Sequence, residues 1–243
     1  MGRQKFGSVT GIDGVLLVNK PKGMTSHDIV HKVRKHFSLA KVGHGGTLDP
    51  NATGLLVLLI GRGTKSSQAV MDGDKTYEGI LHLGIATASQ DVDGEVLSET
   101  DASGITEAEL LDAFVAHTGE YEQIPPMVSA IKKDGVPLYK LAREGKEVER
   151  KTRPVHIYDF EMLDYNNPQS RFRFSCSKGT YVRTFCADVG DSLKVGGHLA
   201  ELIRQRSGDF HVDDAFELED IMSWELDQLI EGVQPAPKPV PQP

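Results

Sequence analysis

Residues 43–54 form the stretch of this chain best suited to chemistry. They read Gly-His-Gly-Gly-Thr-Leu-Asp-Pro-Asn-Ala-Thr-Gly and carry a single carboxylate, Asp49. The glycines leave the backbone open to close approach by another molecule, and Pro50 biases Asp49 toward an extended conformation. Such a carboxylate can act as a nucleophile or stabilise a developing positive charge. The alternative is that Asp49 only caps a turn completed by Asn51 and Gly54.

The flanking segments can position this loop. Residues 55–60 are uniformly apolar and predict a fully buried strand or a short core helix directly behind it. Thr25 or Ser26 is expected to cap a helix that runs to about Phe37. Residues 155–165 and 171–177 alternate as two strands joined by a turn, and residues 75–84 alternate as another. Within that last strand, Tyr77 could simply be a packing residue.

Three other patterns do not support a cofactor site. His27 and His31 approach the zinc-protease pattern, but the acid between them is Asp28 and no third ligand is suitably spaced. Residues 61–65 lack the spacing of a phosphate-binding P-loop. Residues 87–95 lack the spacing of a calcium loop, so we expect a solvated turn there.

Composition limits the class of protein. The chain has 243 residues, 39% hydrophobic and 26% charged, with a net charge of −8. It contains no apolar run long enough to span a membrane and no secretory signal, and Cys176 and Cys186 are expected to be buried thiols in a reducing cytoplasm. We expect a disordered lead-in over residues 1–10, one catalytic domain over 11–231, and a proline-rich tail or linker over 232–243.

One segment departs from the acidic background. Between Lys132 and Arg153 there are eight Lys or Arg residues and four Asp or Glu residues, a local excess of four positive charges. Such runs are usually solvated faces. In an acidic chain, however, this basic segment could bind a nucleic-acid backbone, with Lys140, Arg143 and Lys146 as candidate contacts. Residues 203–206 add two more arginines.

Taken in order, six motifs resemble the TruB family of bacterial tRNA pseudouridine synthases. They occupy residues 18–26, 43–54, 75–77, 125–132, 138–145 and 177–184, and the resemblance runs from about residue 12 to residue 215. Each motif alone is weak, whereas six in this order are specific. The resemblance implies isomerisation of uridine 55 in the T-loop of tRNA to pseudouridine, without cofactor or metal.

The resemblance also assigns roles to individual residues. Asp49 matches the nucleophile, Tyr77 the tyrosine that stacks on the target base, and Arg183 the arginine that pairs with the catalytic carboxylate. His44 matches the residue that fills the gap left by the flipped base. The remaining substrate-binding candidates are Tyr181, Leu202 and Lys20. The small C-terminal RNA-binding domain of many relatives is expected to be absent.

The predicted fold is α+β, with a mixed, mostly antiparallel sheet flanked by helices and a central RNA-binding cleft. The expected partner is the T-arm of tRNA, bound by a cytoplasmic monomer. A non-catalytic tRNA-binding or folding module on the same fold is the first alternative, although it would not need Asp49, Tyr77 and Arg183 together. An Asp-dependent hydrolase is the second, but it would normally need another carboxylate.

Overall fold

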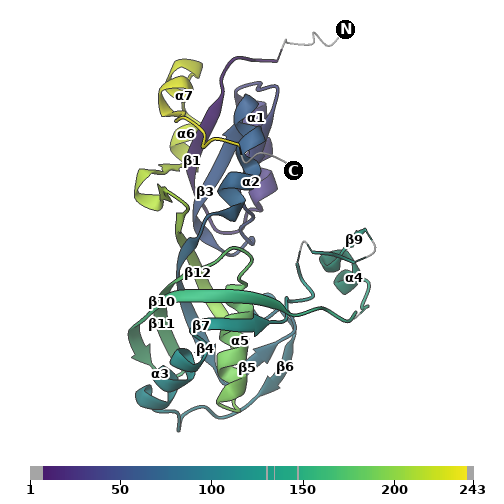
Figure 1. The fold of residues 1–243 in the computed structure, drawn as a ribbon, viewed down its shortest axis with the longest axis vertical. Coiled ribbons are helices and arrows are strands. Elements are labelled where there is room, and N and C mark those ends of the chain that lie inside the picture. Colours follow the sequence, from purple (N-terminus) through teal and green to yellow (C-terminus); the bar gives the residue numbers. More distant parts are fainter. Residues whose placement is uncertain (1–7, 130, 134, 147, 240–243) are drawn as a thin grey trace. The chain divides into compact units, whose positions relative to one another are not determined.

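The structure, a computed structural model, describes residues 8–129, 131–133, 135–146 and 148–239. The chain divides into two compact units (Figure 1). Unit 1 comprises Met1–Tyr77 and Ile203–Pro243, and unit 2 comprises Glu78–Leu202. The chain passes between the units within strands β4 (Lys75–Leu83) and β12 (Gly197–Ser207).

Unit 1 is built on a sheet whose centre is β3 (Thr53–Ile60). This strand pairs antiparallel with β1 (Gly14–Lys20) and with β2 (Val42–His44), and parallel with β12 at Thr53 and Gly54. The short strands β13 (Phe210–His211) and β14 (Phe216–Glu217) pair with β12 and β1. Residues 55–60 are at most 1% exposed, so the apolar run is a buried strand and not a helix. Its alternate side chains form a core with those of β1 and with Val70 of α2 (Ser67–Asp72), made up of Val15, Leu17, Leu55, Val57, Leu59 and Val70.

The first helix begins where the sequence predicts. Thr25 caps α1 (Ser26–His36), and its hydroxyl accepts a hydrogen bond from the Asp28 N–H while the Asp28 carboxylate accepts one from the Thr25 N–H. Ile29, Val30 and Val33 form its buried face. The other helices of unit 1 are α2 (Ser67–Asp72), α6 (Leu218–Ile221) and α7 (Leu226–Gly232).

Unit 2 contains the two long strands predicted from alternation. The strand β10 (Arg153–Asn166) pairs antiparallel with β11 (Gln169–Cys176) on one side and β7 (Gly119–Gln123) on the other. Phe114 from α3 (Glu107–Ala116) and Phe185 from α5 (Val182–Ser192) pack with Phe160 and Phe172. Both cysteines are buried and free, as expected. Unit 2 also contains a small two-stranded antiparallel sheet formed by β5 (Ile85–Thr87) and β6 (Val96–Glu99).

The basic segment contains β8 (Lys132–Lys133), β9 (Val136–Pro137) and α4 (Leu138–Arg143). Among the described residues β1 pairs parallel with β14 and β3 with β12, whereas the longer pairings of β1 with β3 and of β10 with β11 and β7 are antiparallel. The predicted mixed, mostly antiparallel α+β class is therefore confirmed.

Both terminal regions are more ordered than the sequence suggested where they are described. Residues 1–7 and 240–243 lie outside the described residues. The Val9 N–H donates to Ser38 O (2.8 Å), so the lead-in pairs with the chain before residue 10. Gln234 exchanges two backbone hydrogen bonds with Val15, both 2.8 Å, and the Ser66 hydroxyl donates to Pro237 O. The proline-rich segment thus covers the edge of unit 1 through residue 237 and is not a free tail there.

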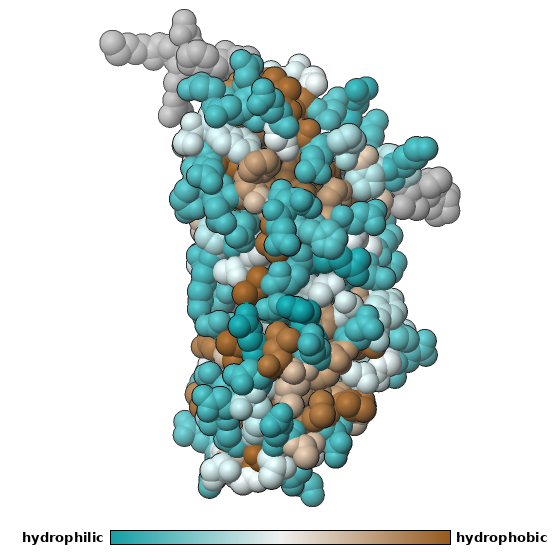
Figure 2. Space-filling view, turned by 90° about the vertical axis from the view of Figure 1, so that its left-hand side faces the viewer, coloured by the Kyte–Doolittle hydropathy of each residue, from teal (hydrophilic) through white to brown (hydrophobic). Residues whose placement is uncertain are grey.

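On the face drawn in Figure 2, hydrophilic side chains are interspersed with small hydrophobic areas. No helix of the described residues is both long and apolar enough to cross a membrane.

Candidate active site

The loop that carries Asp49 connects two paired strands of unit 1. His44 at the end of β2 lies opposite Leu58, and the next N–H, of Gly45, donates to Val57 O (2.9 Å). A Cβ atom at Gly45 would lie 2.3 Å from Val70 Cγ1. Only glycine therefore allows the loop to pass this close to α2. The Ala52 N–H donates to Asp49 O (3.1 Å) and closes a turn around Pro50.

Lys20 holds this turn from inside the protein. Its side chain is fully buried, and its ammonium donates to the carbonyls of Pro21 (2.9 Å), Met24 (2.7 Å) and Pro50 (3.1 Å). Burial lowers the pKa of Lys20 to about 8, while the negative charge of Asp49 opposes that shift. At neutral pH the Lys20 ammonium is therefore a buried positive charge that interacts electrostatically with the Asp49 carboxylate.

Two further side chains fix the segment before Asp49. The Ser26 hydroxyl both accepts from the Leu48 N–H (2.8 Å) and donates to Leu48 O (3.1 Å). Arg204, on β12 and only 2% exposed, donates to the carbonyls of Gly46 (3.2 Å) and Thr47 (3.3 Å). The loop is thus held by buried side chains along its length, and Asp49 itself is partly accessible.

His44 and Tyr77 are the other unit 1 residues predicted for the site. The His44 Nδ1 accepts from the Gly46 N–H (3.3 Å). Burial, reinforced by the charge of Arg204, lowers the pKa of His44 and so favours its neutral imidazole. Tyr77 lies on β4 and is 9% exposed, which leaves its ring mostly enclosed by protein.

Arg183 lies in the first turn of α5, in unit 2, and is 4% exposed. Its guanidinium donates to Ser89 O and Val128 O, both at 2.9 Å, and lies 3.5 Å from the Asp91 carboxylate. Asp91 was expected only as part of a solvated turn. Instead, Asp91 forms an ion pair with Arg183 within unit 2. The Asp91 carboxylate also accepts hydrogen bonds from the Ser89 hydroxyl and the Asp93 N–H.

Tyr181 precedes α5 and is anchored through its backbone. Gln123, which is fully buried, accepts from the Tyr181 N–H (2.7 Å) and donates to Tyr181 O (3.0 Å). The guanidinium carbon of Arg153 lies 5.7 Å from the centroid of the Tyr181 ring. Leu202 lies on β12 and is partly buried.

The basic segment is held far more loosely. Lys140 and Lys146 are exposed, and Lys146 donates to the Glu144 carboxylate at 2.8 Å. The side chain of Arg143 lies outside the described residues. A surface pair of this kind contributes little to stability and leaves the lysine available to other anions.

The predicted residues therefore fall into two sets. Lys20, His44, Asp49 and Tyr77 belong to unit 1, where Lys20 and Asp49 interact electrostatically. Tyr181, Arg183 and Leu202 belong to unit 2. The sequence predicted Asp91 only as part of a solvated turn and Arg204 only as additional basic charge, because neither residue type nor spacing reveals a partner far along the chain.

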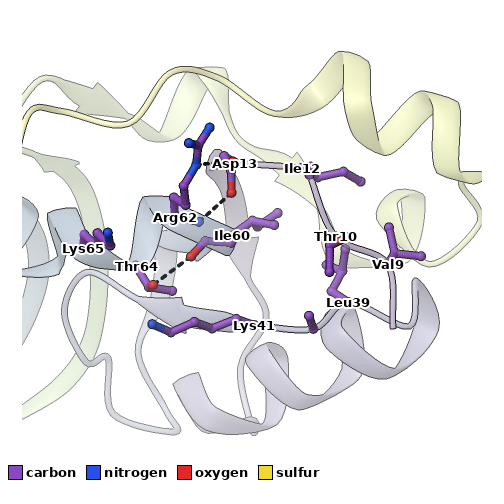
Figure 3. Close-up of a pocket in the computed structure, with 13 residues that line it drawn as sticks. Val9, Thr10, Ile12, Asp13, Leu39, Lys41, Ile60, Arg62, Thr64 and Lys65 are labelled. Carbon is purple, nitrogen blue, oxygen red and sulfur yellow. Dashed lines mark hydrogen bonds and ion pairs between the residues drawn. The ribbon is translucent and has the colours of Figure 1, made fainter. Parts of the chain in front are cut away.

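Two other features lie apart from these sets. Within the described residues there is no group of three His, Cys, Asp or Glu side chains that could hold a metal. A pocket of about 510 Å³ in unit 1 is bordered by Ile12, Asp13, Lys41, Ile60, Arg62 and Lys65 (Figure 3). It opens at the end of β3 opposite to the Asp49 loop and contains none of the predicted site residues.

Solved structures define the class to which this arrangement belongs. The chain matches Cbf5 in solved structures of its complexes. In a Cbf5-Nop10-Gar1 complex the match has a TM-score of 0.73 and 29% identity, over 92% of this chain and 60% of that chain. In an archaeal box H/ACA sRNP Nop10-Cbf5 complex the TM-score is 0.66 with 28% identity, over 90% of this chain and 57% of that chain. The chain thus spans less than two thirds of these Cbf5 chains.

Sequence comparison then gives the family. Residues 34–182 match the model of the TruB family pseudouridylate synthase N-terminal domain, and residues 183–237 match that of the tRNA pseudouridylate synthase B C-terminal domain. The tRNA pseudouridine synthase B of Opitutus terrae is 47% identical over 95% of both chains. That of Aromatoleum aromaticum is 50% identical over 85% of this chain and 67% of its own. The chain belongs to the TruB family and is a tRNA pseudouridine synthase.

The second family match bears on the expected domain organisation. Residues 183–237 match a C-terminal-domain model, and the expected absence of the small C-terminal RNA-binding domain of many relatives stays a prediction. These residues begin with α5 in unit 2 and continue through β12 into unit 1.

Proposed function

We propose that this enzyme converts uridine 55 in the T-loop of tRNA to pseudouridine, with Asp49 as the nucleophile. The observation that carries the proposal is the placement of Asp49. Its carboxylate is partly accessible, on a loop whose backbone is held by buried side chains, and the charged Lys20 lies in electrostatic contact with it. Rigid presentation of a charged group before substrate arrives is what electrostatic catalysis requires.

The reaction requires three changes at the target nucleotide. The bond between C1′ and N1 breaks, the uracil turns in place, and a bond forms between C1′ and C5. Asp49 acts at C1′ while the base is detached, as carboxylates do in glycoside chemistry. The proton lost from C5 is balanced by one gained at N1. Because substrate and product are isomers, the overall reaction needs no oxidant, reductant or cofactor.

The other predicted residues take roles around that step. Arg183 pairs with the Asp49 carboxylate in the complex with RNA and favours its ionised form, because a guanidinium close to an Asp stabilises the charged state. The ring of Tyr77 stacks on the detached uracil and helps to move the proton from C5, and Tyr181 and Leu202 complete an enclosure that excludes water.

His44 fills the space that the flipped base leaves, which offsets part of the few kcal/mol that unstacking costs. Its neutral imidazole suits this role, since a neutral ring can stack without carrying a charge into the base stack. Lys20 serves the site by holding the Asp49 turn.

The T-arm is bound through its backbone by the basic segment, with Lys140, Arg143 and Lys146 as contacts. We propose that the enzyme acts as a monomer, in the cytoplasm.

The test uses tRNA transcripts tritiated at C5 of uridine. The native chain should release tritium, and Asp49→Asn should bind tRNA with native affinity but lose turnover by about 10³-fold or more, since the substitution removes only a charge. Release should also be lost when the T-loop uridine is changed. Near-native turnover by Asp49→Asn would refute its assignment. Release from neither chain would favour the non-catalytic tRNA-binding alternative, and free uracil would favour a hydrolase.

A further inference from the structure

Arg204 occupies a position that its charge alone does not explain. It lies on β12 next to β3, and its side chain is among the largest fully buried ones in the described part of the protein. Removing a cation from water is costly unless its donors are satisfied. Arg204 meets this cost with backbone carbonyls and, within the described residues, forms no ion pair.

The three carbonyls lie on both sides of the nucleophile. Arg204 Nε donates to Leu55 O (2.7 Å), at the start of the buried strand that follows the loop. Its two terminal nitrogens donate to Thr47 O (3.3 Å) and Gly46 O (3.2 Å), which precede Asp49. One planar group therefore ties the entrance of the Asp49 loop to its exit.

Close packing reinforces this connection. Gly54 has φ +91°, and a side chain there would stand 2.5 Å from Arg204 O and 2.8 Å from Arg204 N. The backbone of β12 consequently lies directly against the end of the loop, which only glycine permits in this conformation. Arg204 also acts electrostatically on both His44 and Lys20, which places its charge among the groups that surround the loop.

We propose that Arg204 is a positioning residue for pseudouridine formation, which holds the two arms of the Asp49 loop in the geometry needed for attack at C1′. This inference rests on the proposed role of Asp49. Arginine is needed because a guanidinium offers five N–H donors in a rigid plane, whereas a lysine ammonium cannot span three carbonyls in fixed directions.

The primary test compares Arg204→Lys with Arg62→Lys. Arg62 is a matched control in the same unit, since its Nε also donates to a fixed partner, Asp13 Oδ2 (2.6 Å), but at the opposite end of β3 (Figure 3). Arg204→Lys should lower kcat by about 30- to 100-fold and leave the KM for tRNA within about threefold, the size expected when a reacting group is displaced by about 1 Å. Arg62→Lys should change neither. Native kcat in Arg204→Lys would overturn the proposal.

Amide hydrogen exchange separates positioning from general destabilisation. In Arg204→Lys, the amides of Gly45, Leu48 and Ala52 should exchange at least about tenfold faster, while those of β1 keep their native rates. Equal acceleration in both places would reduce Arg204 to an ordinary structural residue. If the variant does not fold, the native enzyme decides. Loop amides protected within about tenfold of β3 support the proposal, and exchange typical of a free surface loop refutes it.

Binding provides the last control. In the Asp49→Asn background, adding Arg204→Lys should leave tRNA affinity within about twofold, because the loop then has no chemistry left to position. A large loss of affinity would mean that Arg204 serves RNA binding instead. The native rate tests the proposed function and the ratio of variant to native rate tests Arg204, so the two can fail separately.

Discussion

The Asp49 loop in unit 1 and the Arg183 site in unit 2 solve opposite electrostatic problems. In unit 1 the functional group is an anion, and its loop is held by the buried cations of Lys20 and Arg204, whose N–H groups donate to backbone carbonyls. In unit 2 the functional group is a cation, and it is held by two carbonyls and the Asp91 carboxylate. Each unit thus neutralises and orients its own charge. This comparison indicates that both groups are preorganised before RNA binds.

Asp91→Asn tests the Arg183 site and should have the largest effect after that of Asp49→Asn. The amide keeps the size of the side chain but removes the charge that lies 3.5 Å from the Arg183 guanidinium. We expect kcat to fall by about 10²-fold with little change in KM, as for loss of an interaction that orients a catalytic group. Single-turnover rates with saturating tRNA would measure this.

Asp93→Asn is the matched control, since Asp93 is exposed in the same turn and only its backbone N–H contacts Asp91. Its kcat should equal that of the native enzyme. If both variants have the same kcat, the position of Arg183 does not depend on Asp91, and the two sites do not hold their charged groups in comparable ways.

The pH dependence of stability tests the anionic half. Burial lowers the pKa of Lys20 from 10.5 in the unfolded chain to about 8 in the folded protein. Below pH 8 both states are charged and the burial cost is present in full. As the pH rises from 8 toward 10.5, the folded protein loses the proton first, so that cost declines and stability increases.

Lys20→Met removes this titration. The free energy of unfolding of the native enzyme, relative to that of Lys20→Met, should rise by about 2 kcal/mol between pH 8 and pH 9.5. Urea denaturation of both proteins across this range gives the difference. Native activity should decline over the same interval as the loop loses its cation. A difference in the free energy of unfolding that is independent of pH would show that Lys20 does not lose its proton in the folded protein over this pH range.

The sequence predicted the local features and missed those that depend on distant contacts. The Thr25 cap and the buried run at residues 55–60 each follow from neighbouring residues, and the structure confirms both. Arg204 and Arg206 look alike in sequence, yet the former is buried and bonded to residues about 150 positions away. Likewise, the acidic residues within 87–95 all look solvated in the sequence, but in the structure Asp91 lies beside Arg183 of α5.

The termini show the same limit. Composition predicted disorder at the proline-rich end, but Gln234 finds an unpaired strand edge at Val15 and both backbone hydrogen bonds form. Proline content describes the freedom of an isolated segment, whereas pairing with an edge depends on the fold that the rest of the chain has already made.

The basic segment contrasts with the Asp49 loop and the Arg183 site, because it lacks the preorganisation of those two sites. Lys133, Lys140, Lys146 and Lys151 are exposed, and the ion pair between Lys146 and Glu144 lies at the surface. Replacing Lys140, Arg143 and Lys146 with Gln should weaken tRNA binding by about tenfold at moderate salt, and lower the slope of log K against log salt by about 2 to 3. The kcat at saturating tRNA should stay native, because these side chains contribute charge and no fixed geometry. An unchanged salt slope would identify the segment as a solvated face, and a reduced kcat would mean that it orders part of the catalytic site on binding.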